Sequence, residues 1–145
     1  MNITAELMPV ASVTPQDAEL FSGWAWERRE QTCFDPDTLS YPRSCMAKAS
    51  DGDGSFLFLP FHPVLMFESL ITKPGVSASK TALGMFRIGE QAEAIARQTG
   101  HGEAYFITND ADEVALTQKR GWVVVMQDAE KKLWLMKRKF PKEGQ

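Results

Sequence analysis

The sequence predicts an α+β protein in which a mostly antiparallel sheet is flanked by helices. Three observations predict this class. Short apolar segments separated by turn residues dominate positions 44–71, and a long amphipathic pattern at 80–99 precedes a buried-type segment at 104–108. The segments 123–127 and 132–139 then flank a turn sequence, which is typical of a β-hairpin. The second half of the chain therefore runs strand, helix, strand, helix, strand.

The N-terminal region contains a candidate strand and a helix. Residues 2–13 mix apolar and polar positions and can form the first strand. Thr14 is suited to cap a helix, Pro15 to occupy its first position, and Asp17 to lie near the positive end of the helix dipole. The pattern therefore predicts a helix over 15–31. Its apolar positions are Ala18, Phe21, Trp24 and Ala25.

The next segments favour an antiparallel meander. Residues 44–49 can form a short strand, and 50–55 is a turn sequence because its glycines tolerate positive φ. The apolar segments 56–61 and 64–71 follow as strands. Because 64–71 is the most apolar of these segments, we expect it to be central in the sheet.

The C-terminal half carries clear helix boundaries. The helix predicted over 80–99 ends before Gly100, a residue suited to a C-terminal cap. After the strand at 104–108, Asp110 and Glu113 have the spacing of a capping box. Gly121 ends the short helix that follows. The long helix is recognised by Leu83, Met85, Phe86, Ile88, Ala92, Ile95 and Ala96.

Composition narrows the class of protein. A length of 145 residues predicts one domain, 1–145, with a core that needs neither disulfides nor metal. No apolar run reaches the length of a membrane span, and the first residues lack a signal-peptide pattern, so synthesis in the cytoplasm is expected. The net charge of -3 gives no reason to expect nucleic-acid binding. Cys33 and Cys45 are expected to be free thiols.

The ordered segments from 44 to 139 resemble the GCN5-related N-acetyltransferase (GNAT) family. The resemblance implies an α/β/α layered fold with a mixed, mostly antiparallel central sheet. In that family, a loop with the pattern Arg/Gln-x-x-Gly-x-Gly/Ala precedes the long helix. Its backbone N–H groups bind the pyrophosphate of acetyl-CoA, as helix N-termini bind anions in general. Glycines let the backbone approach the phosphates closely.

This chain departs from the family loop. Pro74 matches the proline that often begins it, but the arginine position falls at Ser77, the first glycine at Lys80 and the second at Ala82. The start of the helix is therefore either an anion site or a solvated cap. The candidate cofactor-binding residues are Ser77, Ser79, Lys80, Thr81 and Ala82.

Other family positions are also altered. The resemblance places Asn109 where an asparagine contacts the pantetheine arm, although Asn also favours turns for its own reasons. It places Thr117 where a tyrosine often acts as general acid, and a threonine hydroxyl is too weak an acid for that role. Glu68 lies where some members hold a general base, so it is a weak catalytic candidate. Gly121 and Trp122 take the place of the family's Gly-Phe pair.

Other candidate sites have simpler interpretations. The segment 51–55 resembles the start of an EF-hand loop, but Phe56 and His62 replace its required glycine and glutamate, so a hairpin turn is expected. His62 and His101 lack zinc-site spacing, and no metal is predicted. The basic segment 131–139 is interpreted as a protected terminal edge strand in preference to a nucleic-acid site.

Two aromatic residues are candidate interface positions. Trp26 should point away from the face shared by Phe21 and Trp24, and Phe34 follows the helix. Core packing is the alternative interpretation for both. A regulatory protein that binds a host factor through this aromatic helix is accordingly one hypothesis for the function.

The run 58–70 resembles GNAT-like proteins of tailed bacteriophages. This resemblance implies a non-catalytic structural or assembly protein of the virion that contacts other virion proteins, in multiple copies and without a cofactor. The alternative is an active acetyl-CoA-dependent N-acetyltransferase in the cytoplasm. That enzyme could still position an amine for direct attack on the thioester.

Overall fold

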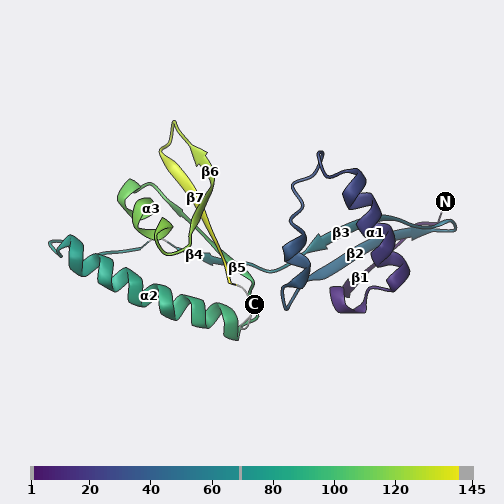
Figure 1. The fold of residues 1–145 in the computed structure, drawn as a ribbon, viewed down its shortest axis with the longest axis horizontal. Coiled ribbons are helices and arrows are strands. Elements are labelled where there is room, and N and C mark those ends of the chain that lie inside the picture. The colour runs from purple at the N-terminus through teal and green to yellow at the C-terminus, as the bar shows by residue number, and fades with distance from the viewer. Residues whose placement is uncertain (1, 69, 141–145) are drawn as a thin grey trace. The chain divides into compact units, whose positions relative to one another are not determined.

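The computed structural model describes residues 2–68 and 70–140. It confirms the α+β class, because these residues form two sheets with mostly antiparallel pairing and three flanking α-helices (Figure 1). Contacts along the chain define two compact units, Met1–Pro63 and Val64–Gln145, each with its own sheet. A single domain over 1–145 stays a prediction.

The first unit contains an antiparallel three-stranded meander, in which the predicted segments 44–49 and 56–61 form two of the strands. The predicted third strand of the meander, 64–71, is not part of this sheet. Its strands are β1 (Thr4–Pro9), β2 (Cys45–Asp51) and β3 (Gly54–Phe61), paired in that order. At the hairpin turn, the Asp51 carboxylate accepts a hydrogen bond from the Asp53 amide at 2.8 Å. Gly54 has φ 113°, a conformation that favours glycine. The turn predicted at 50–55 is therefore confirmed.

Helix α1 (Pro15–Glu27) begins as predicted. Thr14 Oγ1 accepts a hydrogen bond from the Asp17 amide at 3.1 Å, and Pro15 takes the first helical position. The helix ends at Glu27 instead of residue 31, because the backbone at Arg28 leaves helical geometry, with φ -103° and ψ 14°. Short 3-10 helices lie at Val10–Ser12 and Pro36–Ser40.

Helix α1 covers one face of the three-stranded sheet. The rings of Phe21 and Trp24 lie 5.9 Å and 5.3 Å from the ring of Phe58 on β3. On the same face, Asp17 accepts hydrogen bonds from Lys48 Nζ at 2.5 Å and Ser55 Oγ at 3.0 Å. Of the predicted apolar side of the helix, Phe21 and Trp24 therefore pack on the sheet, whereas Ala18 is exposed.

The other face of this sheet is mainly apolar. Cross-strand neighbours lie on the same face of a sheet, and the register aligns Leu7 with Ala47 and Ala47 with Leu59. Leu7 and Leu59 are 64% and 63% exposed. We call this surface the apolar sheet face. Its members are Ala5, Leu7, Pro9, Cys45, Ala47, Ala49, Leu57, Leu59 and Phe61.

The second unit has a four-stranded sheet in the order β4-β5-β7-β6. Its strands are β4 (Leu65–Phe67), β5 (Glu103–Thr108), β6 (Val123–Asp128) and β7 (Leu133–Lys139). Strands β4 and β5 pair in parallel, and the other pairs are antiparallel.

Two expectations about these strands are wrong. Strand β4 is short, because its pairing with β5 stops at Phe67 opposite Phe106. It is also terminal in its sheet, where β5 is its only neighbour among the described residues. The central position expected for 64–71 is therefore not found. Strand β7 is interior, because it pairs with β5 on one side and β6 on the other. The expected edge protection by its lysines does not apply.

Two helices complete the second unit. Helix α2 (Ala78–Gln98) ends as predicted, since Gly100 has φ 73° and the His101 amide donates to the Ala96 carbonyl at 2.9 Å. Helix α3 (Ala111–Gln118) is followed by Gly121 with φ 91°. The buried core of this unit comprises Ala96, Ala104, Phe106, Val114, Trp122, Met136 and Phe140.

Candidate binding cavity

A cavity of about 760 Å³ opens within the second unit, where α2, α3 and the end of β4 approach one another. It begins where the pairing of β4 with β5 stops, because Phe67 and Phe106 form the last pair and both line it. Its walls are mainly apolar, and they include Met66, Met85, Phe86, Leu116 and Trp122.

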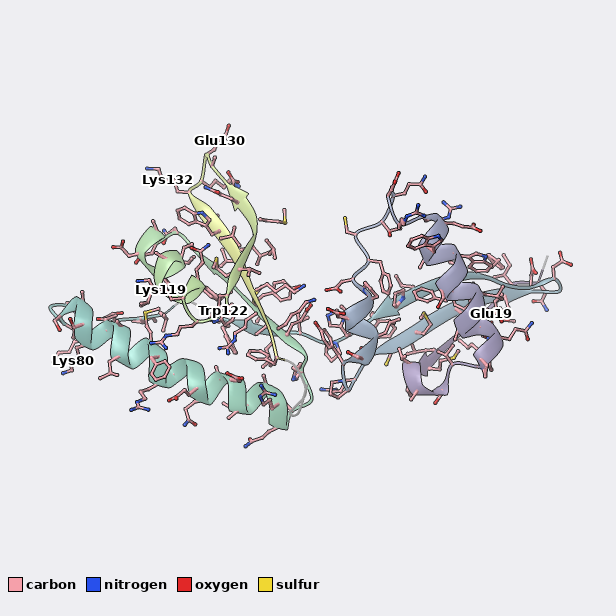
Figure 2. The ribbon with its side chains drawn as sticks, in the orientation of Figure 1. Glu19, Lys80, Lys119, Trp122, Glu130 and Lys132 are labelled. Atoms are coloured by element: carbon pink, nitrogen blue, oxygen red, sulfur yellow. The ribbon has the colours of Figure 1, made fainter. Side chains whose placement is uncertain are left out.

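Trp122 belongs both to the buried core of the second unit and to the wall of the cavity. Its side chain is buried, and its ring lies 4.7 Å from the ring of Phe106 and 6.0 Å from that of Phe67. Figure 2 shows Trp122 just after α3, on the side of the sheet near α2. Packed aromatic rings give this wall a fixed shape.

A salt-bridge network joins α2 to the sheet along the cavity. Glu93 accepts hydrogen bonds from Arg97 on its own helix and from Arg138 on β7, each at 2.8 Å. The hydrogen bond from Arg97 is the main reason that the pKa of Glu93 lies below its ordinary value, and the positive charge of Arg138 adds to the effect. Glu93 is therefore ionised and paired, a state unsuited to proton abstraction at neutral pH.

A second group of cations lies at the end of α3. The Arg120 guanidinium lies 4.0 Å from the centre of the Phe86 ring on α2, and both residues line the cavity. Lys119 also lines it and appears beside α3 in Figure 2. Neither Lys119 nor Arg120 has an ion pair within residues 2–68 and 70–140.

Three of the predicted site positions line this cavity: Glu68, Ala82 and Thr117. Glu68 is exposed at the end of β4 and has no ion pair among the described residues. The Thr117 hydroxyl donates to the backbone carbonyls of Glu113 at 2.8 Å and Val114 at 3.1 Å. Its proton is therefore directed at its own helix and away from the cavity.

The start of α2 has the geometry of a solvated cap. Ser77 Oγ accepts a hydrogen bond from the Lys80 amide at 3.2 Å, so one helix-terminal donor is already satisfied. Ser77, Ser79 and Lys80 are exposed, and Thr81 is half-buried. Lys80 lies at the first turn of α2, away from α3 (Figure 2). Of residues 77–82, only Ala82 reaches the cavity.

Asn109 lies outside the residues that line the cavity. It is exposed and precedes Asp110, whose carboxylate accepts hydrogen bonds from the amides of Asp112 and Glu113. The capping box predicted here is only half formed. The Glu113 carboxylate accepts from Thr108 Oγ1 at 2.8 Å, and the Asp110 amide donates to Thr108 Oγ1 at 3.1 Å.

The aromatic candidates lie in the first unit. Trp26 is 68% exposed, and the Arg29 guanidinium lies 4.1 Å from its ring centre. Phe34 is half-buried, with its ring 5.3 Å from that of Phe21, so it belongs to the aromatic cluster on α1. The two cysteines are free thiols: Cys33 is exposed and Cys45 is half-buried.

The remaining sequence candidates have structural explanations. His62 packs against Tyr41, with ring centres 5.1 Å apart. Within the described residues, no group of three or more His, Cys, Asp or Glu side chains could hold a metal ion. Among the same residues, no helix has the length and apolar character needed to span a membrane.

The cavity also contains residues that sequence reasoning missed. The spacing of Glu93 and Arg97 gives a signal for a pair within one helix. Nothing in the sequence indicates that Arg138 joins them from a strand 45 positions away. The position of Arg120 over Phe86 likewise depends on tertiary contact.

Comparison with known proteins finds no matching family model and no matching curated protein. Several solved structures are similar. The PaiA N-acetyltransferase of Thermoplasma acidophilum, solved in complex with coenzyme A, is 15% identical and has a TM-score of 0.44, covering 97% of this chain and 100% of its own. An acyl-CoA N-acyltransferase of Pseudomonas aeruginosa is 11% identical with a TM-score of 0.41, covering 94% and 99%.

An acetyltransferase of the GNAT family from Streptococcus pneumoniae gives a similar result. It is 14% identical and has a TM-score of 0.40, covering 97% of this chain and 100% of its own. At such identities and TM-scores, these similarities carry no information on the activity of this chain.

Proposed function

We propose that this chain is a non-catalytic GNAT-like protein that acts through protein–protein contacts as a structural or assembly component of a tailed phage virion. It would be made in the host cytoplasm and incorporated in several copies beside other virion proteins. The phage assignment rests on the resemblance of residues 58–70 to phage GNAT-like proteins. No cofactor is required for this role.

The observation that carries the proposal is the state of the Thr117 hydroxyl. This residue stands where the family often places a tyrosine acid. Its hydroxyl donates to two carbonyls of its own helix, at 2.8 Å and 3.1 Å. A general acid must be within hydrogen-bond reach of the atom that it protonates, and its pKa must suit the working pH. Both the residue type and its hydrogen bonding favour a structural role.

The start of α2 gives further support. Acetyl-CoA would need several backbone N–H groups directed at its diphosphate, and a backbone free of side chains beside it. Here the Lys80 amide is bonded to Ser77 Oγ, and a lysine side chain stands at the first glycine position. This part of the chain does not fit the diphosphate of acetyl-CoA.

Exposed apolar surface supports a role in protein–protein contacts. The apolar sheet face carries leucines that are more than half exposed, and Trp26 is 68% exposed on α1. Contiguous apolar patches on soluble proteins commonly mark interaction sites, and tryptophan is enriched among residues that dominate binding energy.

Two measurements test the proposal. Purified phage particles are examined by quantitative mass spectrometry for this chain, with a major capsid protein as the reference for copy number. The chain is expected in several copies per particle. Its absence from intact particles of a phage that encodes it would contradict the virion role.

The non-catalytic part is tested separately by titrating acetyl-CoA into the protein. The wild type is expected to show no saturable micromolar binding. A matched variant, Ser77→Arg with Lys80→Gly, restores the arginine and first glycine of the family pattern. If only this variant binds acetyl-CoA, the altered loop explains why the wild type does not bind it. Binding of acetyl-CoA by the wild type would contradict the proposal.

The second candidate is an active acetyl-CoA-dependent N-acetyltransferase. It is favoured by one observation, the exposed Glu68 carboxylate on the rim of a cavity large enough for a small ligand. Thiol release from acetyl-CoA across a panel of amines is the direct assay. Turnover by the wild type that is lost in Glu68→Gln would favour the enzyme, and rates at background would remove it.

A further inference from the structure

The cavity of the second unit has the size and walls of a ligand site. Its volume of about 760 Å³ lies within the usual range for pockets that bind small organic molecules. Phe86, Leu116 and Trp122 contribute three of its apolar walls. An apolar body placed there would remove its own surface and theirs from water, which is favourable.

Most charged groups around the cavity already have partners. Glu93 is bonded to two guanidinium groups, Glu90 forms an ion pair with Arg87 at 3.1 Å, and Glu113 accepts from Thr108. These groups therefore have little to gain from a charged ligand.

Among the charged groups that line the cavity in the described part of the chain, Arg120, Lys119 and Glu68 have no ion pair. The Arg120 guanidinium lies over the Phe86 ring, and in the described part of the chain it meets no carboxylate. Lys119, the preceding residue, also lines the cavity and has no ion pair among the described residues. A guanidinium that lies over an aromatic ring can still donate hydrogen bonds to a carboxylate.

We infer that this cavity binds an amphiphilic monocarboxylate, with its carboxylate at Arg120 and Lys119 and its apolar chain against Phe86, Leu116 and Trp122. A single negative charge fits better than a diphosphate for two reasons. The unpaired Glu68 carboxylate on the rim would repel a strongly anionic ligand. The first turn of α2, with Lys80, does not line the cavity. This inference does not depend on the proposed function.

Isothermal titration with decanoate tests the inference, with decanol as a neutral ligand of equal chain length. Decanoate is expected to bind saturably with one site, and more tightly than decanol. Arg120→Ala should weaken decanoate binding about tenfold, as expected for a lost charge-assisted hydrogen bond, while leaving decanol binding unchanged. No saturable binding of decanoate to the wild type would overturn the inference.

Arg87→Ala is the matched control. Arg87 is also near the Phe86 ring, at 5.7 Å, but it pairs with Glu90 and does not line the cavity. Its loss should change decanoate affinity less than twofold. If both arginine variants weaken decanoate binding equally, the effect comes from the overall charge of the protein, and the proposed site at Arg120 is wrong.

A blocking variant tests the position of the chain. Gly89 lines the cavity, and a Cβ added there meets no atom within 4 Å, so Gly89→Leu can fill the space without a clash at Cβ. Circular dichroism and thermal unfolding verify that the variant folds. The folded variant should lose affinity for decanoate and decanol alike, and retained affinity would place the ligand elsewhere and overturn the inference.

Discussion

Arg138 on β7 donates a hydrogen bond to Glu93 on α2 at 2.8 Å, and so connects the long helix to the middle of the sheet. Both side chains are partly buried, with exposures of 23% and 27%. Arg97 occupies the other carboxylate oxygen of Glu93 at 2.8 Å. The position of α2, and hence one wall of the cavity, depends in part on this carboxylate.

We predict that Arg138→Met lowers the free energy of unfolding by about 1.5–3 kcal/mol, the range for a hydrogen bond to a charged group. Methionine keeps most of the apolar contact of the arginine stem but leaves Glu93 with one partner. Urea denaturation measures the effect. Arg87→Met is the control, because Arg87 and Glu90 form an exposed pair expected to contribute less than about 1 kcal/mol. Equal losses in the two variants would contradict a special role for Arg138.

A second prediction concerns acid stability. The hydrogen bond from Lys48 is the main cause that holds the pKa of Asp17 below its ordinary value of 3.8. Because the folded-state pKa is the lower one, the stabilisation is complete above about pH 4 and is lost as the pH falls through the folded-state pKa. The wild type should therefore lose stability progressively below about pH 4.

Asp17→Asn removes this dependence. The variant should be less stable than the wild type at pH 7, by about 1–3 kcal/mol, and the difference should shrink as the pH falls. Urea denaturation at several pH values between 7 and 2 measures it. Glu19→Gln, an exposed change on the same helix, should keep the slope of the wild type (Figure 2). A constant difference between Asp17→Asn and the wild type at every pH would contradict the assignment.

Local chemistry in the sequence predicted the boundaries of several elements. The caps at Thr14 and Gly100 and the turn before Gly54 involve residues within a few positions of one another, so the sequence contains what decides them. The amphipathic period of α2 is local in the same sense.

Contacts between distant residues could not be predicted in this way. Strand β7 was expected at an edge, yet it pairs with β5 some thirty positions earlier, and only the tertiary fold decides that. In the cavity, Glu68 and Thr117 were identified by their place in a family pattern. The direction of the Thr117 hydroxyl depends on its rotamer, and the contact of Arg120 with Phe86 depends on how two helices approach.

A third prediction separates the two tryptophans of α1. Trp24 packs on Phe58, so Trp24→Ala should lower the free energy of unfolding by about 2 kcal/mol or more. Trp26 is 68% exposed, so Trp26→Ala should change it by less than about 0.5 kcal/mol. Thermal or urea unfolding measures both. If Trp26 acts in assembly, its variant should remain folded but be depleted from purified particles, and normal incorporation would remove it as a contact residue.

A final prediction uses two glycines in contrasting conformations. Gly84 lies in helical backbone on α2, and an added Cβ meets no atom within 4 Å, so Gly84→Ala should raise the free energy of unfolding by about 0.5–1 kcal/mol. Gly121 has φ 91°, and a Cβ there would lie 3.6 Å from Arg138 Nε. Gly121→Ala should therefore lower the free energy of unfolding by about 1 kcal/mol or more. In urea denaturation, the two variants should therefore change the free energy of unfolding in opposite directions. A stabilising effect of Gly121→Ala would contradict the positive φ at the turn between α3 and β6.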